Sequence, residues 1–327
     1  PYFIYRVYGV GAFRLVADFV LITSFISLPF WIAQNLSSSV DITLVSIVHA
    51  LHSQFPWDSW PRSMLIYTVG LDYSFMDEIG LYRFSSLFNE PGKFSFWINY
   101  AIIIYLLSGD RILSKRILFL IGMLITTFST GGYLQFFMIA LAYFLASSSY
   151  NIGVRYALLG IFLIFFITQY QRVSFLQPKV QEHIEIQQDV ALEGAVTTGR
   201  FIRVRKGLEA IKNHPVIGRG ISSATQVEGT TSTTYIGNVG GFIGFTARYG
   251  VPLSILFFVF FYRGFKYLTY INNRSTFLAL GLWGSVMAAF IGQGTPLWNP
   301  IMLLFFIHGY LHYGIKLKKK TLSAWQN

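Results

Sequence analysis

The sequence predicts an all-α, polytopic membrane protein, and its composition, its apolar runs and the placement of its basic residues support this fold class. Of its 327 residues, 54% are hydrophobic and only 12% are charged, with 32 Phe and 20 Tyr. The mean hydropathy is +0.52. Soluble globular domains rarely have such a composition. Since an isolated segment in lipid must satisfy its own backbone hydrogen bonds, we expect the apolar runs to be helices.

About eight apolar segments are candidate membrane spans, and we expect the chain to form a single integral-membrane domain over residues 1–327. The segments cover residues 11–33, 94–107, 117–128, 131–146, 152–169, 242–262, 276–291 and 297–314. Several are shorter than the ~20 residues of a full crossing, so the pair on either side of residues 129–130 is also compatible with a tilted or re-entrant hairpin. The chain begins Pro-Tyr-Phe without an initiator methionine, and we expect the natural protein to begin further upstream.

The basic residues predict the orientation of these spans. The net charge is +11, and every second connection between spans carries a basic cluster, which is typical of cytoplasmic loops. The clusters are Arg6; Arg111, Lys115 and Arg116; Arg155; Arg263, Lys266 and Arg274; and Lys316, Lys318, Lys319 and Lys320. Membrane orientation therefore explains the charge better than nucleic-acid binding, and both ends are expected in the cytoplasm. Residues 34–93 and 170–241 then form two long extracytoplasmic loops.

The second long loop contains the most basic segment, residues 200–220. Thr197 and Thr198 offer an N-cap and Pro215 ends the pattern, so residues 200–213 are predicted to form a helix. The helical spacing gives this helix an apolar stripe, with Arg200 and Arg203 flanking Gly207 at its edge. The stripe consists of Phe201, Val204, Leu208 and Ile211. Two guanidinium groups beside a residue without a side chain suit a bulky anion. A solvated basic face is the alternative interpretation.

Three further charged residues are candidates for a site. Arg83 and Glu90 precede the span at 94–107 on the predicted outer side, and Arg248 is predicted in the outer part of the span at 242–262. An arginine at membrane depth is a functional candidate, with snorkelling to the interface as the alternative. Glu90 is the best-placed carboxylate for a general base, and a turn-capping or salt-bridging glutamate is its alternative role.

Other chemistries have little support in the sequence. It contains no phosphate-binding glycine loop, no dinucleotide fingerprint and no paired-aspartate motif for a metal-bound nucleotide sugar. Two histidine pairs have spacings that are found in metal sites, but the later pair has no carboxylate near it in the sequence. We therefore expect no metal and no cofactor. The pairs are His49 and His52, and His308 and His312.

Three motifs together resemble the O-antigen polymerase and ligase superfamily, integral-membrane glycosyltransferases of the Wzy type. Arg200 is followed by Leu208, Ile211, His214-Pro215, Gly218 and Gly220, similar to the family's arginine, helix and Pro-hydrophobic-hydrophobic-Gly-x-Gly turn. Arg83 with Asn89-Glu-Pro-Gly92 is similar to its arginine and proline-containing turn before a span. Phe128-Ser-Thr-Gly-Gly132 resembles its Ser-x-Gly hairpin. The resemblance covers roughly residues 80–315.

The sequence also departs from the family pattern. Val204 stands where tryptophan is usual, and Thr130 where arginine is common. Gly237-Asn238 stands where the ligases carry His-Asn before the span that follows the long loop. The missing histidine and the Glu90-Pro91 pair favour a polymerase over a ligase.

The resemblance implies a GT-C-like fold and a metal-independent glycosyltransferase in the bacterial inner membrane, with its active site on the outer face. Its expected substrates are a polyprenyl-pyrophosphate-linked saccharide donor and a lipid-linked acceptor; membrane lipids and a chain-length regulator are further expected partners. The expected catalytic residues are Glu90, Arg83 and Arg200. The expected substrate-binding residues are Arg203, Arg248, Asn238 and Tyr235.

Two other functions remain open from the sequence. An O-antigen ligase would transfer finished glycan to lipid A-core instead of to a lipid-linked repeat unit. A transporter of anions or of lipid-linked glycans belongs to a different class, and its arginines would be distributed through the membrane depth. We find no internal repeat of the kind that many transporters contain, and the arginines outside the cytoplasmic clusters gather on one side.

Overall fold

The computed structural model describes most of the predicted spans and part of the two long loops. The described residues are 6–53, 63–64, 67–69, 80–88, 90–146, 153, 160, 200–220, 224–226, 233–235, 241–289 and 303–311. Their contacts form two compact units. The first unit is Ile4–Ile139, and the second comprises Ala140–Asn327 with Pro1–Phe3. Each unit is described by itself below.

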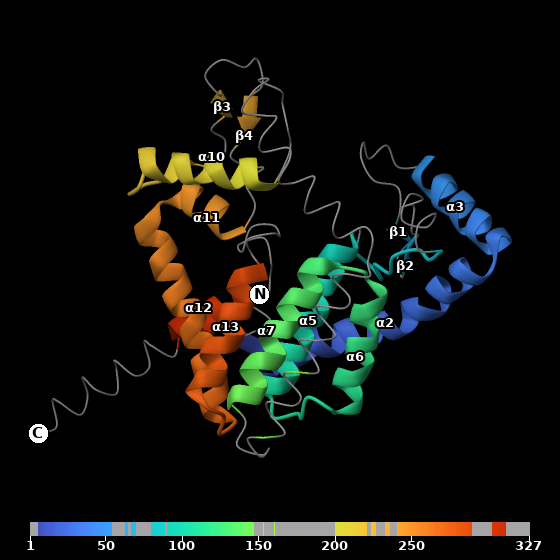
Figure 1. Ribbon diagram of the computed structural model, residues 1–327, viewed down its shortest axis with the longest axis horizontal. Coiled ribbons are helices and arrows are strands. Elements are labelled where there is room, and N and C mark those ends of the chain that lie inside the picture. The colour runs from blue at the N-terminus through green and yellow to red at the C-terminus, as the bar shows by residue number, and fades with distance from the viewer. Residues whose placement is uncertain are drawn as a thin grey trace, which may run out of the picture. The chain divides into compact units, whose positions relative to one another are not determined.

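Helices dominate the described residues (Figure 1). In the first unit the helices are α2 (Gly11–Leu36), α3 (Ser38–Ser53), α5 (Pro91–Leu107), α6 (Lys115–Thr126) and most of α7 (Thr130–Ala146). In the second unit they are α10 (Arg200–Asn213), α11 (Gly241–Tyr249), α12 (Val251–Ile271) and α13 (Thr276–Ala289), followed by helical residues 303–311. The mostly helical fold agrees with the predicted class.

Two small antiparallel hairpins within the predicted long loops are the exception to the all-α prediction. In the first loop, β1 (Ser63–Met64) pairs with β2 (Tyr67–Thr68). In the second loop, β3 (Ala224–Gln226) pairs with β4 (Thr233–Tyr235), so that Ala224 lies opposite Tyr235. The first loop also contains the helix α3.

Two of the described helices, α2 and α12, are long and apolar enough to cross a membrane. Residues 130–146 and 276–289 form shorter apolar helices, α7 and α13. The predicted span at 152–169 lies outside the described residues, apart from Gly153 and Gly160. The predicted number of eight spans therefore remains a prediction.

The predicted span at 242–262 is wrong as a single continuous helix. The chain breaks at Gly250, whose φ is +82°, and α12 then runs to Ile271, beyond the predicted end. Pro252 in the first turn of α12 explains the break, because a proline ring cannot continue the hydrogen bonding of a preceding helix. The candidate span is therefore α12, and α11 is a separate helix that precedes it.

Helix α5 is the centre of the first unit and packs against both α2 and α6. Its side chains are buried around the whole circumference, including Phe94, Ile98 and Tyr105. The Tyr105 hydroxyl donates to Asp18 Oδ1 of α2 at 2.6 Å, so a carboxylate inside this apolar packing has a hydrogen-bond donor. A helix that is apolar on every side is typical of a buried helix.

A polar network fixes the end of the first long loop to the end of α2. The hydroxyl of Tyr67 donates to Gln34 Oε1, and Gln34 Nε2 donates to Asp41 Oδ1 at 2.8 Å. The hydroxyl of Tyr82 donates to Asp41 Oδ2 at 3.0 Å. Burial raises the pKa of Tyr67, so this phenol remains a neutral donor at physiological pH. The network places residues 82–86, and with them Arg83, beside α2.

A glycine contact joins α5 to the beginning of α7. Ser95 Oγ donates to Ser129 Oγ at 3.0 Å, and Asn99 Nδ2 donates to the Gly132 carbonyl at 2.8 Å. A Cβ atom at Gly132 would lie 2.5 Å from the Ser95 Cβ. The two helices therefore approach closely here because position 132 has no side chain.

We predict that Gly132→Ala lowers the thermal stability of the detergent-solubilised protein, whereas Gly131→Ala does not. Overpacking at a tight contact costs about 1–3 kcal/mol, and a Cβ at Gly131 meets nothing within 4 Å. In a Ser95→Gly background, the cost of Gly132→Ala should largely disappear, because the clashing Cβ is gone. Equal losses in both backgrounds, measured as a double-mutant cycle of melting temperatures, would contradict the contact.

Candidate functional site

The residues that the sequence singles out form two clusters, one in each unit. In the first unit, the cluster consists of Arg83, Glu90 and the turn at residues 127–132 between α6 and α7. In the second unit, it consists of α10, the turn at residues 214–220 and the end of α11 with Arg248. We call them the first and second cluster. Because Arg83 and Arg200 belong to different units, their convergence on one pocket remains a prediction.

Arg83 binds the C-terminal end of α6. Its Nε and Nη2 donate to the carbonyls of Thr127 and Phe128, each at 3.1 Å. These carbonyls lie past the last turn of the helix, where acceptors have no helical partner and the helix dipole attracts a cation. A guanidinium has five N–H donors, and these two bonds use two of them. Arg83 therefore has a clear structural role in holding the turn between α6 and α7.

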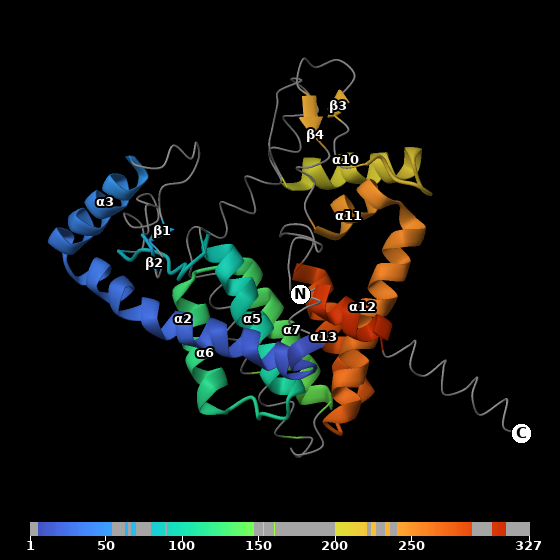
Figure 2. The same cartoon turned by 180° about the vertical axis from the view of Figure 1, so that it is seen from behind.

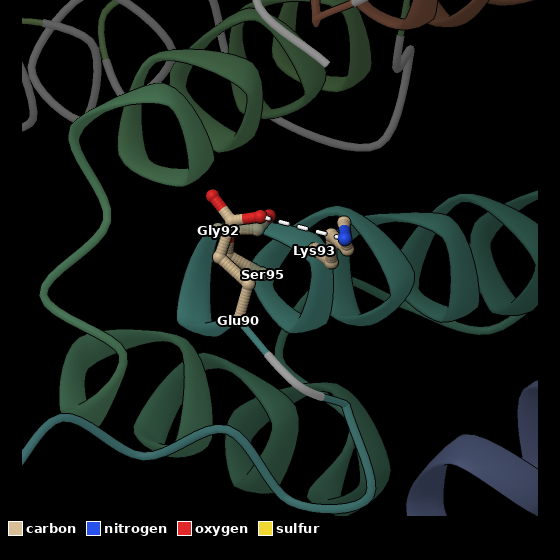
Figure 3. Close-up of polar contacts among 4 residues, drawn as sticks. All are labelled: Glu90, Gly92, Lys93 and Ser95. Carbon is tan, nitrogen blue, oxygen red and sulfur yellow. Dashed lines mark hydrogen bonds and ion pairs between the residues drawn. The ribbon is translucent and has the colours of Figure 1, made fainter. Parts of the chain in front are cut away.

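Glu90 occupies the N-cap position of α5, in extended conformation, with Pro91 starting the helix. Its side chain makes no capping hydrogen bond. Instead Glu90 Oε2 pairs with Lys93 Nζ at 3.6 Å, and both side chains are about half exposed (Figure 3). An exposed pair of this kind contributes only about 0–1 kcal/mol. A weak ion pair with Lys93 therefore holds the carboxylate at the N-terminal end of α5, and a substrate can displace this ion pair.

Helix α10 covers residues 200–213 as the sequence predicts, but the predicted apolar stripe is partly wrong. Leu208 is 53% exposed, whereas Gly207 and Ala210 are buried. Ala210 packs against Ala247 of α11, with Ile211 beside them. The reason is steric: small residues allow the two helices to approach closely, so α10 turns Gly207 and Ala210 toward α11 rather than its largest aliphatic residue.

The positions of Arg200 and Arg203 follow from this corrected register. They precede Gly207 by seven and four residues, which corresponds to about two turns and one turn of an α-helix. Both positions therefore lie on the face of α10 that turns toward α11. Their side chains lie outside the described part of the structure, as do those of Phe201 and Val204.

The turn at residues 214–220 clamps the end of α10 to the end of α11. Three backbone hydrogen bonds join them: Arg219 N to Ala247 O at 2.8 Å, Gly220 N to Arg248 O at 3.1 Å and Val251 N to Pro215 O at 2.7 Å. Their donors and acceptors are main-chain groups, so the contact requires a particular chain path more than particular side chains. We call this contact the backbone clamp.

Two glycines make the backbone clamp possible. Gly218 and Gly250 have φ values of +73° and +82°, which L-residues with a side chain rarely adopt. A Cβ at Gly218 would collide with the backbone of Arg248 and Gly250, and one at Gly250 would collide with the Val216 carbonyl. The Pro-hydrophobic-hydrophobic-Gly-x-Gly pattern is thus explained by the path of the turn and by close backbone packing.

Arg248 lies in the last turn of α11, next to the backbone clamp, and its side chain is only 5% exposed. It was expected within the span at 242–262, but the break at Gly250 puts it on the short helix that precedes α12. Tyr235 lies on β4 with its side chain outside the described part, and Asn238 lies outside the described residues. Their predicted contacts with substrate remain untested.

Sequence reasoning missed Ser95 and Asn99, which connect α5 to the turn of the first cluster. Ser95 Oγ lies within hydrogen-bond distance of both the Gly92 carbonyl and Ser129 Oγ, and so links the residues after Glu90 to that turn. Their signal in the sequence was the presence of two polar residues four apart in an apolar segment, since polar groups in a span usually bind a neighbouring helix.

The described residues contain no group of three or more His, Cys, Asp or Glu side chains that could hold a metal ion. His308 is buried and its ring lies edge-on to that of Tyr267, with centroids 4.9 Å apart. His312 and the side chains of His49 and His52 lie outside the described part. The expectation of a metal-independent site remains a prediction.

We predict that Gly218→Ala destabilises the protein more than Gly220→Ala. Both residues have positive φ, and a side chain in that conformation costs about 1–2 kcal/mol. Only Gly218 adds a collision with the backbone of α11, because a Cβ at Gly220 meets nothing within 4 Å. Melting temperatures in detergent measure the difference, and equal losses for the two variants would argue against the close approach.

Comparison with known proteins gives one match. Residues 117–258 match the family model described as O-antigen ligase, and this region extends from α6 into α12. It includes the turn of the first cluster and all of the second cluster, whereas Arg83 and Glu90 precede it. No curated protein and no solved structure matches the chain. Residues 117–258 are therefore similar to the O-antigen ligase family, whose members are polytopic membrane proteins that transfer lipid-linked glycans.

Proposed function

We propose that this protein polymerises polyprenyl-pyrophosphate-linked oligosaccharide repeat units of O-antigen or a related surface polysaccharide, on the outer face of the bacterial inner membrane. The observation that carries the proposal is the second cluster. Within the family-matched residues the backbone clamp joins α10, the helix that contains Arg200 and Arg203, to α11, the helix that contains Arg248.

The leaving group explains why arginines suit this site. The acceptor hydroxyl oxygen forms a bond to the anomeric carbon of the donor sugar while the bond from that carbon to the pyrophosphate oxygen breaks. Negative charge then develops on the pyrophosphate. Guanidinium groups remain charged at any working pH and bind phosphate oxygens in pairs. We assign this stabilisation to Arg200 and Arg203, with Arg248 and Arg83 as further donors.

The acceptor hydroxyl must lose its proton as it attacks. We assign the general base to Glu90, whose carboxylate is half exposed and forms an ion pair with Lys93. The proton passes from the hydroxyl to Glu90, and the departing pyrophosphate takes the electron pair of the broken C–O bond. This scheme is balanced without a nucleotide, an oxidant or a metal ion. Tyr235 and Asn238 are assigned to glycan binding on the basis of the family resemblance.

An O-antigen ligase is the second candidate, because the matching family model bears that description. The two activities share the donor and differ only in the acceptor. Gly237 stands where the ligases carry a histidine, and this difference is our reason for preferring the polymerase. Purified protein supplied separately with lipid-linked repeat units and with lipid A-core would distinguish the two by which acceptor is extended.

We expect Arg200→Ala to abolish long polysaccharide chains while the amount of protein in the membrane is unchanged. Loss of a preorganised donor at developing charge costs about 3–4 kcal/mol, or roughly a hundredfold to a thousandfold in rate. Lys212→Ala is the matched control, since it removes an exposed cation from the same helix. The measurement is the length distribution of the polysaccharide on a gel. A normal ladder from Arg200→Ala would contradict the assignment.

Arg83 requires a different design, because it also holds the turn after α6. Arg83→Lys keeps a positive charge but cannot reproduce the two contacts with Thr127 and Phe128 in the same geometry. We expect Arg83→Ala to abolish long chains and Arg83→Lys to reduce them. A normal ladder from Arg83→Ala would exclude Arg83 from the site. Melting temperatures of both variants separate lost structure from lost chemistry.

For the base, we expect Glu90→Gln to lower turnover on purified lipid-linked repeat units by roughly 10²–10⁴-fold, because the amide cannot accept the proton. Lys93→Gln removes the same ion pair but leaves the carboxylate, and should retain most activity. Turnover close to wild type in Glu90→Gln would remove Glu90 from the mechanism. An equal loss in both variants would assign the ion pair a structural role instead.

A further inference from the structure

An exposed pair of aliphatic side chains follows α10, at Val216 and Ile217. Their side chains are 66% and 84% exposed, and Leu208 on α10 is also exposed. Exposed aliphatic side chains are unfavourable in water. Their position in a turn between a basic helix and a glycine therefore suggests that an apolar partner covers them. The backbone clamp holds this turn against the end of α11 and the start of α12.

The turn lies where the candidate span α12 begins. Val251, the first residue of α12, donates its N–H to the Pro215 carbonyl at 2.7 Å, and the Val216 carbonyl packs against Gly250. The first turns of α12 then present further exposed aliphatic side chains, namely Leu253, Ile255 and Leu256. Exposed apolar residues thus follow one another from the turn onto a helix long and apolar enough to cross a membrane.

Helix α10 itself has a different orientation from α12. It lies across the end of α12 rather than alongside it, as both views show (Figures 1 and 2). Residues 200–220 carry six basic residues and one acidic residue, Glu209. A basic helix that lies in the plane of a membrane surface combines attraction to anionic headgroups with insertion of a few apolar side chains.

From these observations we propose that Val216 and Ile217 insert into the bilayer at the membrane face where α12 begins, and that α10 lies in the plane of that face. The occupant of the exposed surface is the lipid itself: acyl chains around Val216 and Ile217, and phosphate headgroups around the basic residues. The proposal concerns membrane attachment of the second cluster and holds whether or not the protein transfers sugars.

The absence of cysteine from the sequence makes a direct test straightforward. Single cysteines are introduced into the full chain as Val216→Cys and Ile217→Cys and labelled with a nitroxide, in vesicles of phosphatidylethanolamine and phosphatidylglycerol. Glu209→Cys, at an exposed position on α10, is the aqueous control, and Ile255→Cys, at an exposed position on α12, is the lipid control. Collision of the label with oxygen reports lipid, and collision with a water-soluble nickel chelate reports solvent.

We expect the ratio of oxygen to nickel collisions at positions 216 and 217 to exceed that at Glu209→Cys severalfold and to approach that at Ile255→Cys. A ratio equal to that of the aqueous control would overturn the proposal. Protection of the labels at positions 216 and 217 from the nickel chelate could also disappear when the protein is diluted with excess lipid. That result would overturn the proposal, because a second copy of the chain, rather than lipid, would then cover the two side chains. Unchanged melting temperatures of the labelled variants establish that the turn is intact.

Discussion

The backbone clamp between the turn at residues 214–220 and the end of α11 is the contact on which the second cluster depends. Three main-chain hydrogen bonds and two glycines with positive φ create it. Because the clamp fixes where α10 ends, it also fixes which face of α10 turns toward α11. The same contact sets the start of α12 and exposes Val216 and Ile217 beside it.

The first cluster is held in a comparable way by contacts to main-chain groups. Arg83 donates to carbonyls beyond the end of α6, and Asn99 donates to the carbonyl of Gly132, where α7 approaches α5. A second network, centred on Gln34 and Asp41, connects Tyr82 to the end of α2, and Ser86 Oγ donates to the Thr23 carbonyl in the middle of that helix. These contacts show why an arginine proposed for catalysis must also be tested for structure. Glu90, whose carboxylate forms an exposed ion pair with Lys93, has more freedom to act on a substrate.

Both clusters illustrate how a membrane-associated site can be assembled with few buried charges. Burial of an unpaired charge is costly: Arg83 lies beside main-chain carbonyls and Glu90 lies at the surface, whereas Arg248 is a buried charge. Glycine residues allow main-chain polar groups of one segment to lie close to a neighbouring helix, so main-chain groups can form contacts that would otherwise need charged side chains.

The sequence by itself determined the helical class, the extent of α10 and the family that residues 117–258 resemble, because these depend on local periodicity, capping and motif order. It could not determine which face of α10 is buried, since Leu208 is the more hydrophobic choice but Gly207 and Ala210 permit a closer approach to α11. Nor did hydropathy locate the break at Gly250, because the apolar pattern continues through it. The roles of Ser95 and Asn99 likewise emerged only when α5 and α7 were brought together, since a hydrogen bond between helices depends on geometry that no single segment contains.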